Sequence, residues 1–194
     1  MDSSANDAQP VRPTGMRPFF VVWAGQACSL LGSQLVQFAL IWWLTDTTGS
    51  ATVLAMASLV GLLPQIIGGP FAGALVDRWN RRLVLIVADS AIALATALLA
   101  LLYSLGMVQV WHIYALMFIR AAGGAFHWPA MQASTTLMVP KQHLSRVAGM
   151  NQTLSGLAFI LIPPLGAMAI EVLPMQGILA IDVATALLAI AALL

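Results

Sequence analysis

Charged side chains are scarce in this sequence of 194 residues. Asp, Glu, Lys and Arg together make up 8% of the chain, whereas soluble domains carry roughly 25% of such residues. Hydrophobic residues make up 60%, so a water-soluble fold of this length could not cover its own apolar surface. The composition therefore excludes an ordinary soluble domain and indicates an integral membrane protein.

Cysteine is almost absent, and so is any loop that could hold a phosphate group. Cys28 is the single cysteine, and the apolar run around it continues to Leu44. That run is too long for a cleaved signal peptide, so we interpret it as a retained helix. One thiol supports neither a disulfide framework nor a thiolate metal site, and no glycine-rich phosphate loop is present. We therefore expect no metal, no cofactor and no ATP-driven activity.

Segments long enough to cross a membrane follow one another along the chain. A spanning helix needs about 20 mainly apolar residues, and residues 1–17 are polar and predicted to form a disordered cytoplasmic tail. Short connections make neighbouring helices antiparallel, so residues 18–194 are predicted to form an all-α bundle of transmembrane helices. Six spans result from this segmentation: 19–44, 51–76, 83–105, 110–133, 148–170 and 178–194.

Basic residues gather in alternate connections. Such residues accumulate on the cytoplasmic side of membrane proteins, which predicts a cytoplasmic amino terminus in the cell membrane. The last span ends at Leu194 without a basic or polar flank, so we expect the chain to be cut there. The basic residues outside the spans are Arg12, Arg17, Arg78, Arg81, Arg82, Lys141 and Arg146.

Arg120 is the single cation inside a predicted span. A charge at membrane depth is costly unless it faces a cavity or meets an acid. Gly123, Gly124 and His127 follow at three, four and seven residues, which places them on the same helix face. We interpret Arg120 as a functional residue on an accessible surface. The alternative is a structural ion pair that fixes the bundle.

Two acids, Asp89 and Asp182, also lie inside predicted spans. At about 1.5 Å rise per residue, Asp182 lies about 8 Å and Arg120 about 15 Å inward from the outer ends of their spans. Those depths allow Arg120 and Asp182 to form an ion pair. Asp89 enters from the opposite side and is the weaker candidate. An acid that exchanges its cation partner is suited to carry a proton, so all three residues are candidates for proton coupling, although either acid is equally explained as a buried structural group.

A polar stripe runs along the first span at spacings of three, four and four residues. We expect it to face a watery cavity, and interhelical hydrogen bonding explains it equally well. Packing or a local hydrogen bond is the alternative for His127. The candidate cavity-lining residues are Gln26, Ser29, Ser33, Gln37, Gly123, Gly124, His127, Asn151 and Ser155.

The connection after the second span combines a glycine, an acid and a basic cluster, namely Gly73, Asp77, Arg78, Arg81 and Arg82. This pattern resembles the signature loop between the second and third helices of the major facilitator superfamily, although Asn80 stands where that family commonly has glycine. An ordinary basic cytoplasmic loop is the alternative. In the family this loop is a conformational latch between two halves, so the resemblance implies that role here.

Further motifs extend the resemblance from about residue 17 to the end of the chain. Arg120 with its following glycines resembles the arginine-glycine motif of the fourth helix, which implies a role in proton coupling. Pro163 and Pro164 resemble a degenerate form of the fifth-helix motif of the family's antiporters, and prolines at membrane depth kink helices. Segments 139–146 and 181–186 resemble the macrolide-efflux branch.

This resemblance implies the amino-terminal six-helix half of a secondary transporter, built from two inverted three-helix repeats. It implies export of bulky amphipathic drugs such as macrolides, driven by the proton gradient, through a cavity lined mainly by spans one, two, four and five. The expected partners are the lipid bilayer, a small amphipathic substrate and a second six-helix half. No nucleic acid is expected.

Three other functions compete with drug export. An uptake permease for a small nutrient is the strongest rival, and the sparse polar lining favours amphipathic cargo over it. A non-transporting membrane scaffold has little reason to keep Arg120 at depth. An intramembrane serine protease would need a serine between glycines, and Ser155 lacks the leading glycine, so no enzyme is expected.

Overall fold

The computed structural model describes residues 16–194. Residues 1–15, which hold Arg12 and nearly all of the predicted tail, lie outside the described residues. The predicted tail includes Arg17, and this part of the prediction is wrong, because Arg17 belongs to the first helix. Pro18 explains this start, because proline in the first helical turn lacks only an amide hydrogen that has no partner there.

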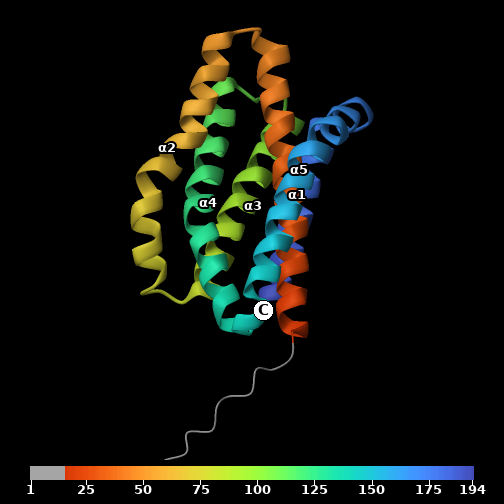
Figure 1. Cartoon of the computed structure of the whole chain (residues 1–194). Helices are drawn as coiled ribbons and strands as arrows, with labels where there is room; N and C mark the ends of the chain where they lie inside the picture. The colour runs from red at the N-terminus through yellow and green to blue at the C-terminus, as the bar shows by residue number, and fades with distance from the viewer. Residues whose placement is uncertain (1–15) are drawn as a thin grey trace, which may run out of the picture.

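The described part of the chain is helical and contains no strand, which confirms the predicted all-α class. Consecutive helices run in opposite directions, and the start of the first helix and the carboxyl terminus lie at the same end of the bundle (Figure 1). The elements are α1 (Arg17–Thr48), α2 (Ala51–Val76), α3 (Arg81–Ser104), α4 (Val110–Met138), the short 3₁₀ turn η1 (Lys141–His143), α5 (Leu144–Val172) and α6 (Met175–Leu193).

Several helices extend beyond the predicted spans. α1 continues to Thr48, α4 continues to Met138, and α5 begins at Leu144. Hydropathy marks only the apolar part of a helix, whereas the backbone hydrogen bonds continue into polar residues. The connection between α1 and α2 therefore consists only of Gly49 and Ser50. Gly49 adopts a positive φ of 57°, and the Ser50 side chain caps α2 by accepting a hydrogen bond from a backbone amide.

Five of the six helices of the described part are long and apolar enough to span a membrane. α4 is the exception by composition, because Arg120, His127 and the adjacent glycines interrupt its apolar run. It nevertheless has 29 residues, which exceeds the length that a bilayer requires. A hydropathy criterion thus misses the helix that carries the buried cation.

The helices pack as two interleaved triplets. α1 packs against α5 and α6, α4 packs against α2 and α3, and α3 and α6 pack against each other. Exchanging the triplet α1–α3 with the triplet α4–α6 reproduces this pattern. Because successive helices alternate in direction, the second triplet is inverted relative to the first. This arrangement agrees with the predicted pair of inverted three-helix repeats.

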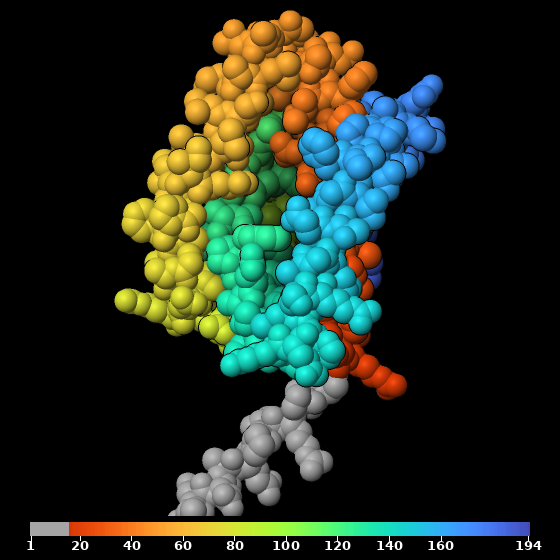
Figure 2. All heavy atoms as spheres, in the orientation of Figure 1, coloured from red at the N-terminus to blue at the C-terminus, as the bar shows by residue number. Residues whose placement is uncertain are grey.

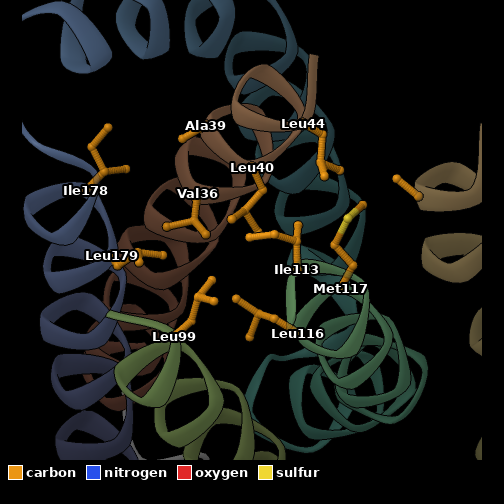
Figure 3. Close-up of a cluster of buried hydrophobic side chains, with 11 residues drawn as sticks. Val36, Ala39, Leu40, Leu44, Leu99, Ile113, Leu116, Met117, Ile178 and Leu179 are labelled. Carbon is orange, nitrogen blue, oxygen red and sulfur yellow. The ribbon is translucent and has the colours of Figure 1, made fainter. Parts of the chain in front are cut away.

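The main hydrophobic core lies where α1 and α4 meet α3 and α6. Val36 and Leu40 of α1 are fully buried, as is Ile113 of α4, and Figure 3 shows their side chains converging with Leu116 and Leu99. Lipid tails are as apolar as leucine, so these contacts stabilise the bundle by close packing and not by excluding water.

The basic connections lie at one end of the bundle. The α2–α3 connection and the α4–α5 turn are both at the end where α1 begins (Figure 1). Arg78, Arg81 and Arg82 lie at or next to the α2–α3 connection, and Lys141 and Arg146 lie at or next to the α4–α5 turn. The charge asymmetry seen along the sequence is therefore also an asymmetry in space.

Candidate functional site

A cavity of about 790 Å³ opens between the helices. Figure 2 shows the molecule hollowed between α2 and α5, with α4 visible at the floor. Its lining comes from α1, α2, α3 and α4. The predicted contribution of span five is wrong for this cavity, because none of its lining residues lies on α5, which packs mainly on α1. The volume suits a drug-sized molecule.

The arginine cluster, defined as Arg120, Asp182, Ser33 and Thr96, lies in the interior of the bundle. The Arg120 Nη1 atom lies 2.5 Å from the Asp182 Oδ2 atom, and its Nη2 atom donates to the Ser33 carbonyl oxygen at 2.8 Å. Asp182 also accepts hydrogen bonds from the Ser33 hydroxyl at 2.9 Å and the Thr96 hydroxyl at 3.1 Å. Asp182 is completely buried, and both of its carboxylate oxygens have partners.

The histidine cluster, defined as His127, Asp89 and Gln26, lies on the cavity wall. The Gln26 amide nitrogen donates to the Asp89 Oδ2 atom at 3.1 Å. The His127 Nε2 atom lies 3.3 Å from the Asp89 Oδ1 atom and 2.8 Å from the Gln26 amide oxygen. Because Nε2 faces two oxygen acceptors, it carries the hydrogen in the neutral ring. All three residues line the cavity.

The residues of the two clusters occupy equivalent positions in the two three-helix repeats. Gln26 and Ser33 are seven residues apart on α1, and Arg120 and His127 are seven residues apart on α4. Each aspartate receives one of these residues from each helix. The exchange of repeats that relates the helices therefore also relates the clusters. The equivalent pairs are Gln26 with Arg120, Ser33 with His127, and Asp89 with Asp182.

Helix depth predicted the Arg120–Asp182 pair, and the structure brings these two residues together. It places Asp89 with His127 and Gln26 instead. Asp89 lies on α3 and Asp182 on α6, and these helices belong to different repeats. The two acids therefore occupy separate sites instead of competing for one cation.

Three of the predicted lining residues lie away from the cavity. Gly123 faces α3, where an added Cβ would approach the Ile92 Cδ1 atom to 2.9 Å, because adjacent helical residues point about 100° apart. Asn151 accepts a hydrogen bond from the Trp23 indole at 2.6 Å, and Ser155 is exposed on α5. The predicted residues that do line the cavity are Gln26, Ser29, Ser33, Gln37, Gly124 and His127.

Some polar residues of the site were missed by the sequence analysis. Gln34, Ser58 and Gln65 line the cavity, and Thr96 belongs to the arginine cluster. Ser58 and Gln65 are seven residues apart, and Thr96 follows Asp89 by seven. A search for polar side chains at that spacing, two helical turns, would have found Ser58, Gln65 and Thr96 but not Gln34.

The α2–α3 connection exposes its acid. The Asp77 side chain is 73% exposed and lies 3.9 Å from the Arg81 guanidinium. Asn80 caps α3 by accepting hydrogen bonds from two backbone amides, which explains an asparagine where the family commonly has glycine. An added Cβ at Gly73 would meet no atom within 4 Å. In this chain Gly73 and Asp77 border open space.

α5 is attached to the bundle mainly through α1. An added Cβ at Gly166 would collide with the ring of Phe38, so this glycine permits close approach of the two helices. Pro163 and Pro164 lie inside α5, which continues through both to Val172. The Trp23–Asn151 hydrogen bond provides a second attachment.

Comparison with known proteins identifies the family. The model of the Major Facilitator Superfamily matches residues 22–194. The chain belongs to the major facilitator superfamily. This confirms the predicted family, and the long apolar helices agree with the predicted multi-pass membrane character.

Relatives of this major facilitator chain include exporters. Macrolide efflux protein A of Streptococcus pyogenes is 43% identical over 171 residues, which are 88% of this chain and 42% of that protein. Macrolide efflux protein A of Enterococcus faecalis is 41% identical over 141 residues, 73% of this chain and 43% of that protein. The multidrug efflux pump Tap of Mycolicibacterium fortuitum is 28% identical over 151 residues, 73% and 36% respectively. The chain thus spans less than half the length of these relatives.

Proposed function

We propose that this chain is the amino-terminal half of a secondary active transporter that exports amphipathic drugs such as macrolides in exchange for protons. The observation that carries the proposal is the buried Arg120–Asp182 pair at the wall of a drug-sized cavity. The similarity to macrolide efflux proteins over 88% of the chain supports the substrate class.

Proton coupling follows from the partners of Asp182. Arg120 also lines the cavity, so a change of its rotamer toward the cavity would leave the Asp182 carboxylate without a cation. A proton from the outer side then binds the Oδ2 atom. The Thr96 hydroxyl, which lies 3.1 Å from this atom, can direct its own hydrogen to the Ile92 carbonyl oxygen and accept the new hydrogen. Return of Arg120 releases the proton to the cytoplasm. Asp89 would exchange a proton in the same way through His127.

The lining of the cavity suits amphipathic cargo. Aliphatic side chains, including Leu54, Leu62 and Met117, share the wall with the amides of Gln34 and Gln37. Apolar walls bury a bulky ligand, while a few amides fix its orientation. A small, highly polar nutrient would leave most of this lining without a partner.

A second six-helix half would complete the transporter. The chain covers 42% of the S. pyogenes relative, and α2 and α5 carry exposed apolar side chains such as Phe71 and Phe159. The second half would cover the open side of the cavity, and the bilayer would cover the other helices. The prolines of α5, Pro163 and Pro164, would give that helix a kink beside the interface.

The role of the α2–α3 connection as a conformational latch and the orientation of the bundle in the membrane are part of the same proposal. The exposed acid Asp77 would meet a helix amino terminus of the second half, where the helix dipole favours an anion, and Gly73 would permit close approach. The basic end of the bundle would face the cytoplasm, together with the amino terminus. The proposed latch residues are Gly73, Asp77, Arg78, Arg81 and Arg82.

Drug accumulation in cells tests this function. Cells producing the full-length transporter should accumulate less of an amphipathic macrolide than cells producing the Asp182→Asn variant, and a protonophore should abolish the difference. Membrane levels of the two proteins are matched by immunoblot. Unchanged accumulation of a broad panel of amphipathic compounds by a well-inserted protein would contradict export and direct the search to nutrient uptake.

A further inference from the structure

The two equivalent aspartates differ in charge balance. Asp182 faces Arg120, a permanent cation. At the equivalent place beside Asp89 stands Gln26, which is neutral. Within residues 16–194, His127 is the only group in contact with Asp89 that can become positive, and it does so only when protonated.

No other charge of the described residues compensates Asp89. α4 and α6 both pack against α3, and the remaining charged groups that they carry inside the bundle are Arg120 and Asp182, which pair with each other. Arg120 is seven residues from His127, about 10 Å along the helix axis. α1 contributes only Gln26 to the contact. With neutral His127, Asp89 therefore lacks a counter-charge.

A carboxylate without a counter-charge is unfavourable inside a membrane protein. Asp89 is 4% exposed, so water supplies little compensation. Three changes relieve this: protonation of the carboxylate itself, protonation of the imidazole at Nδ1, which leaves the Nε2 hydrogen directed at Asp89, and arrival of a cation from the cavity. Only the last two keep Asp89 as an anion.

The cavity gives such a cation access. Asp89, Gln26 and His127 all line it, and the His127 side chain is 23% exposed while that of Asp89 is 5% exposed. The imidazole is thus the more exposed member of the pair, and a cation from the cavity would take its place beside Asp89.

The chemistry of the site favours an organic cation over a metal ion. Hard metal cations take six or more oxygen ligands, and no group of three His, Cys, Asp or Glu side chains that could hold a metal occurs within residues 16–194. A single carboxylate in a large, mainly apolar cavity matches an alkylammonium group attached to an apolar body.

We propose that Asp89 is the subsite for an ammonium group of the cargo, and that protonated His127 is the internal cation that displaces it. This inference rests on the proposed function, because it assumes that cargo enters the cavity. At neutral His127 the cargo cation pairs with Asp89. Uptake of one proton by the His127 ring restores the internal ion pair and releases the cargo, so that one proton replaces one positive charge.

Two matched probes separate the effect of charge from that of shape. One is a dansyl sulfonamide with a trimethylammonium end, which stays charged at every pH, and the other has a tert-butyl group in its place. The fluorescence of each is titrated against the purified full-length protein in lipid nanodiscs. At about pH 8 we expect the charged probe to bind about tenfold more tightly than the neutral probe. This factor is what remains of the attraction to Asp89 after the cost of removing both charges from water. We expect this preference to fall when the titration is repeated at about pH 6, because a proton on the His127 ring would replace the cargo cation as the partner of Asp89.

Two variants assign the preference to residues. Asp89→Asn should bind both probes equally, at the affinity that the wild type has for the neutral probe. His127→Gln keeps a hydrogen-bonding amide but cannot become a cation, so the charged probe should stay preferred by about tenfold at both pH values. A purely structural role of Asp89 would weaken both probes together.

The outcomes distinguish the inference from the function on which it rests. If neither probe binds the wild type, the cavity is not a site for amphipathic cargo, and both proposals fail. If the wild type binds both probes equally at about pH 8, or if Asp89→Asn keeps the preference, the ammonium subsite is wrong while the export proposal stands. If the Asp89→Asn variant does not fold, the His127→Gln variant tests the inference by itself. The inference is wrong if the preference of this variant for the charged probe still falls at lower pH.

Discussion

The arginine cluster and the histidine cluster occupy equivalent places in the two repeats but differ in what surrounds their aspartates. Asp182 is completely buried and contacts a permanent cation and two hydroxyl groups. Asp89 lies at the cavity wall and contacts an amide and a titratable ring. Equivalent positions thus hold a closed ion pair in one repeat, and in the other an aspartate at the cavity wall whose counter-charge can be exchanged.

This difference shows how an inverted repeat can acquire two roles. Gln26, the equivalent of Arg120, also donates from a side-chain nitrogen to one carboxylate oxygen of its aspartate, but it carries no fixed charge. The site without the arginine then depends on a proton or a ligand for its charge balance. Removing members of each cluster and its supporting contacts in turn tests this difference.

Asp182→Asn should have the largest effect on stability. It leaves the Arg120 guanidinium buried without an acid, which costs about 3–5 kcal/mol of unfolding free energy. The matched change Asp89→Asn leaves only neutral groups when His127 is neutral, and should cost about 1–2 kcal/mol. Thermal unfolding followed by size-exclusion chromatography compares them. Equal losses would contradict the difference between a closed and an open cluster.

Removing both members of the closed pair sharpens the same test. Arg120→Met combined with Asp182→Asn should recover most of the stability lost in Asp182→Asn alone, because no buried charge remains. Proton-dependent export should nevertheless be absent. A double variant that is less stable than Asp182→Asn would show that the pair contributes more than charge compensation.

Arg120→Lys should affect coupling more than stability. Lysine keeps the charge beside Asp182 but lacks the planar group that also reaches the Ser33 carbonyl and the Thr96 hydroxyl. We expect a loss of about 1–2 kcal/mol in stability, normal membrane insertion and no protonophore-sensitive export. Drug accumulation assays measure the last property. Normal export by this variant would exclude the role proposed for Arg120.

Glycines beside the two clusters should respond oppositely to alanine. At Gly32 a new Cβ would collide with Thr185 and lie 3.4 Å from the Asp182 Cα atom, so Gly32→Ala should cost about 1–3 kcal/mol. At Gly124, which lines the cavity, no atom lies within 4 Å. Gly124→Ala should be neutral, or stabilising by up to about 1 kcal/mol through helix propensity. Unfolding temperatures of the two variants test this contrast.

Among changes to the cluster residues, the smallest losses of stability should come from the equivalent residues Ser33 and His127. Ser33→Ala removes one of the hydrogen bonds to Asp182 and should cost about 1 kcal/mol. His127→Gln keeps a hydrogen-bonding group at the partly exposed cavity wall, so its cost should be below about 0.5 kcal/mol. The same thermal measurement ranks them, and the reverse order would indicate that the histidine cluster is the more closed of the two.

Much of the site could be predicted from residue type and helix depth. Arg120, Asp89 and Asp182 stood out because charges are rare inside spans, and depth favoured Asp182 over Asp89 as the partner of Arg120. The contact of Asp89 with His127 was not predicted. Sequence separation says nothing about how two helices are rotated toward each other, so a contact between neighbouring helices stays open until they pack.

The sequence by itself determined the membrane class, the six helices, the alternation of basic and non-basic connections, and the family. These properties depend on composition and on local spacing, which any one segment carries alone. Only the tertiary structure decided that Gly124 and not Gly123 lines the cavity. It also decided that Asn151 contacts Trp23 and that the two aspartates form equivalent sites. Those outcomes depend on the rotation and depth of each helix relative to its neighbours, which packing of the whole bundle sets.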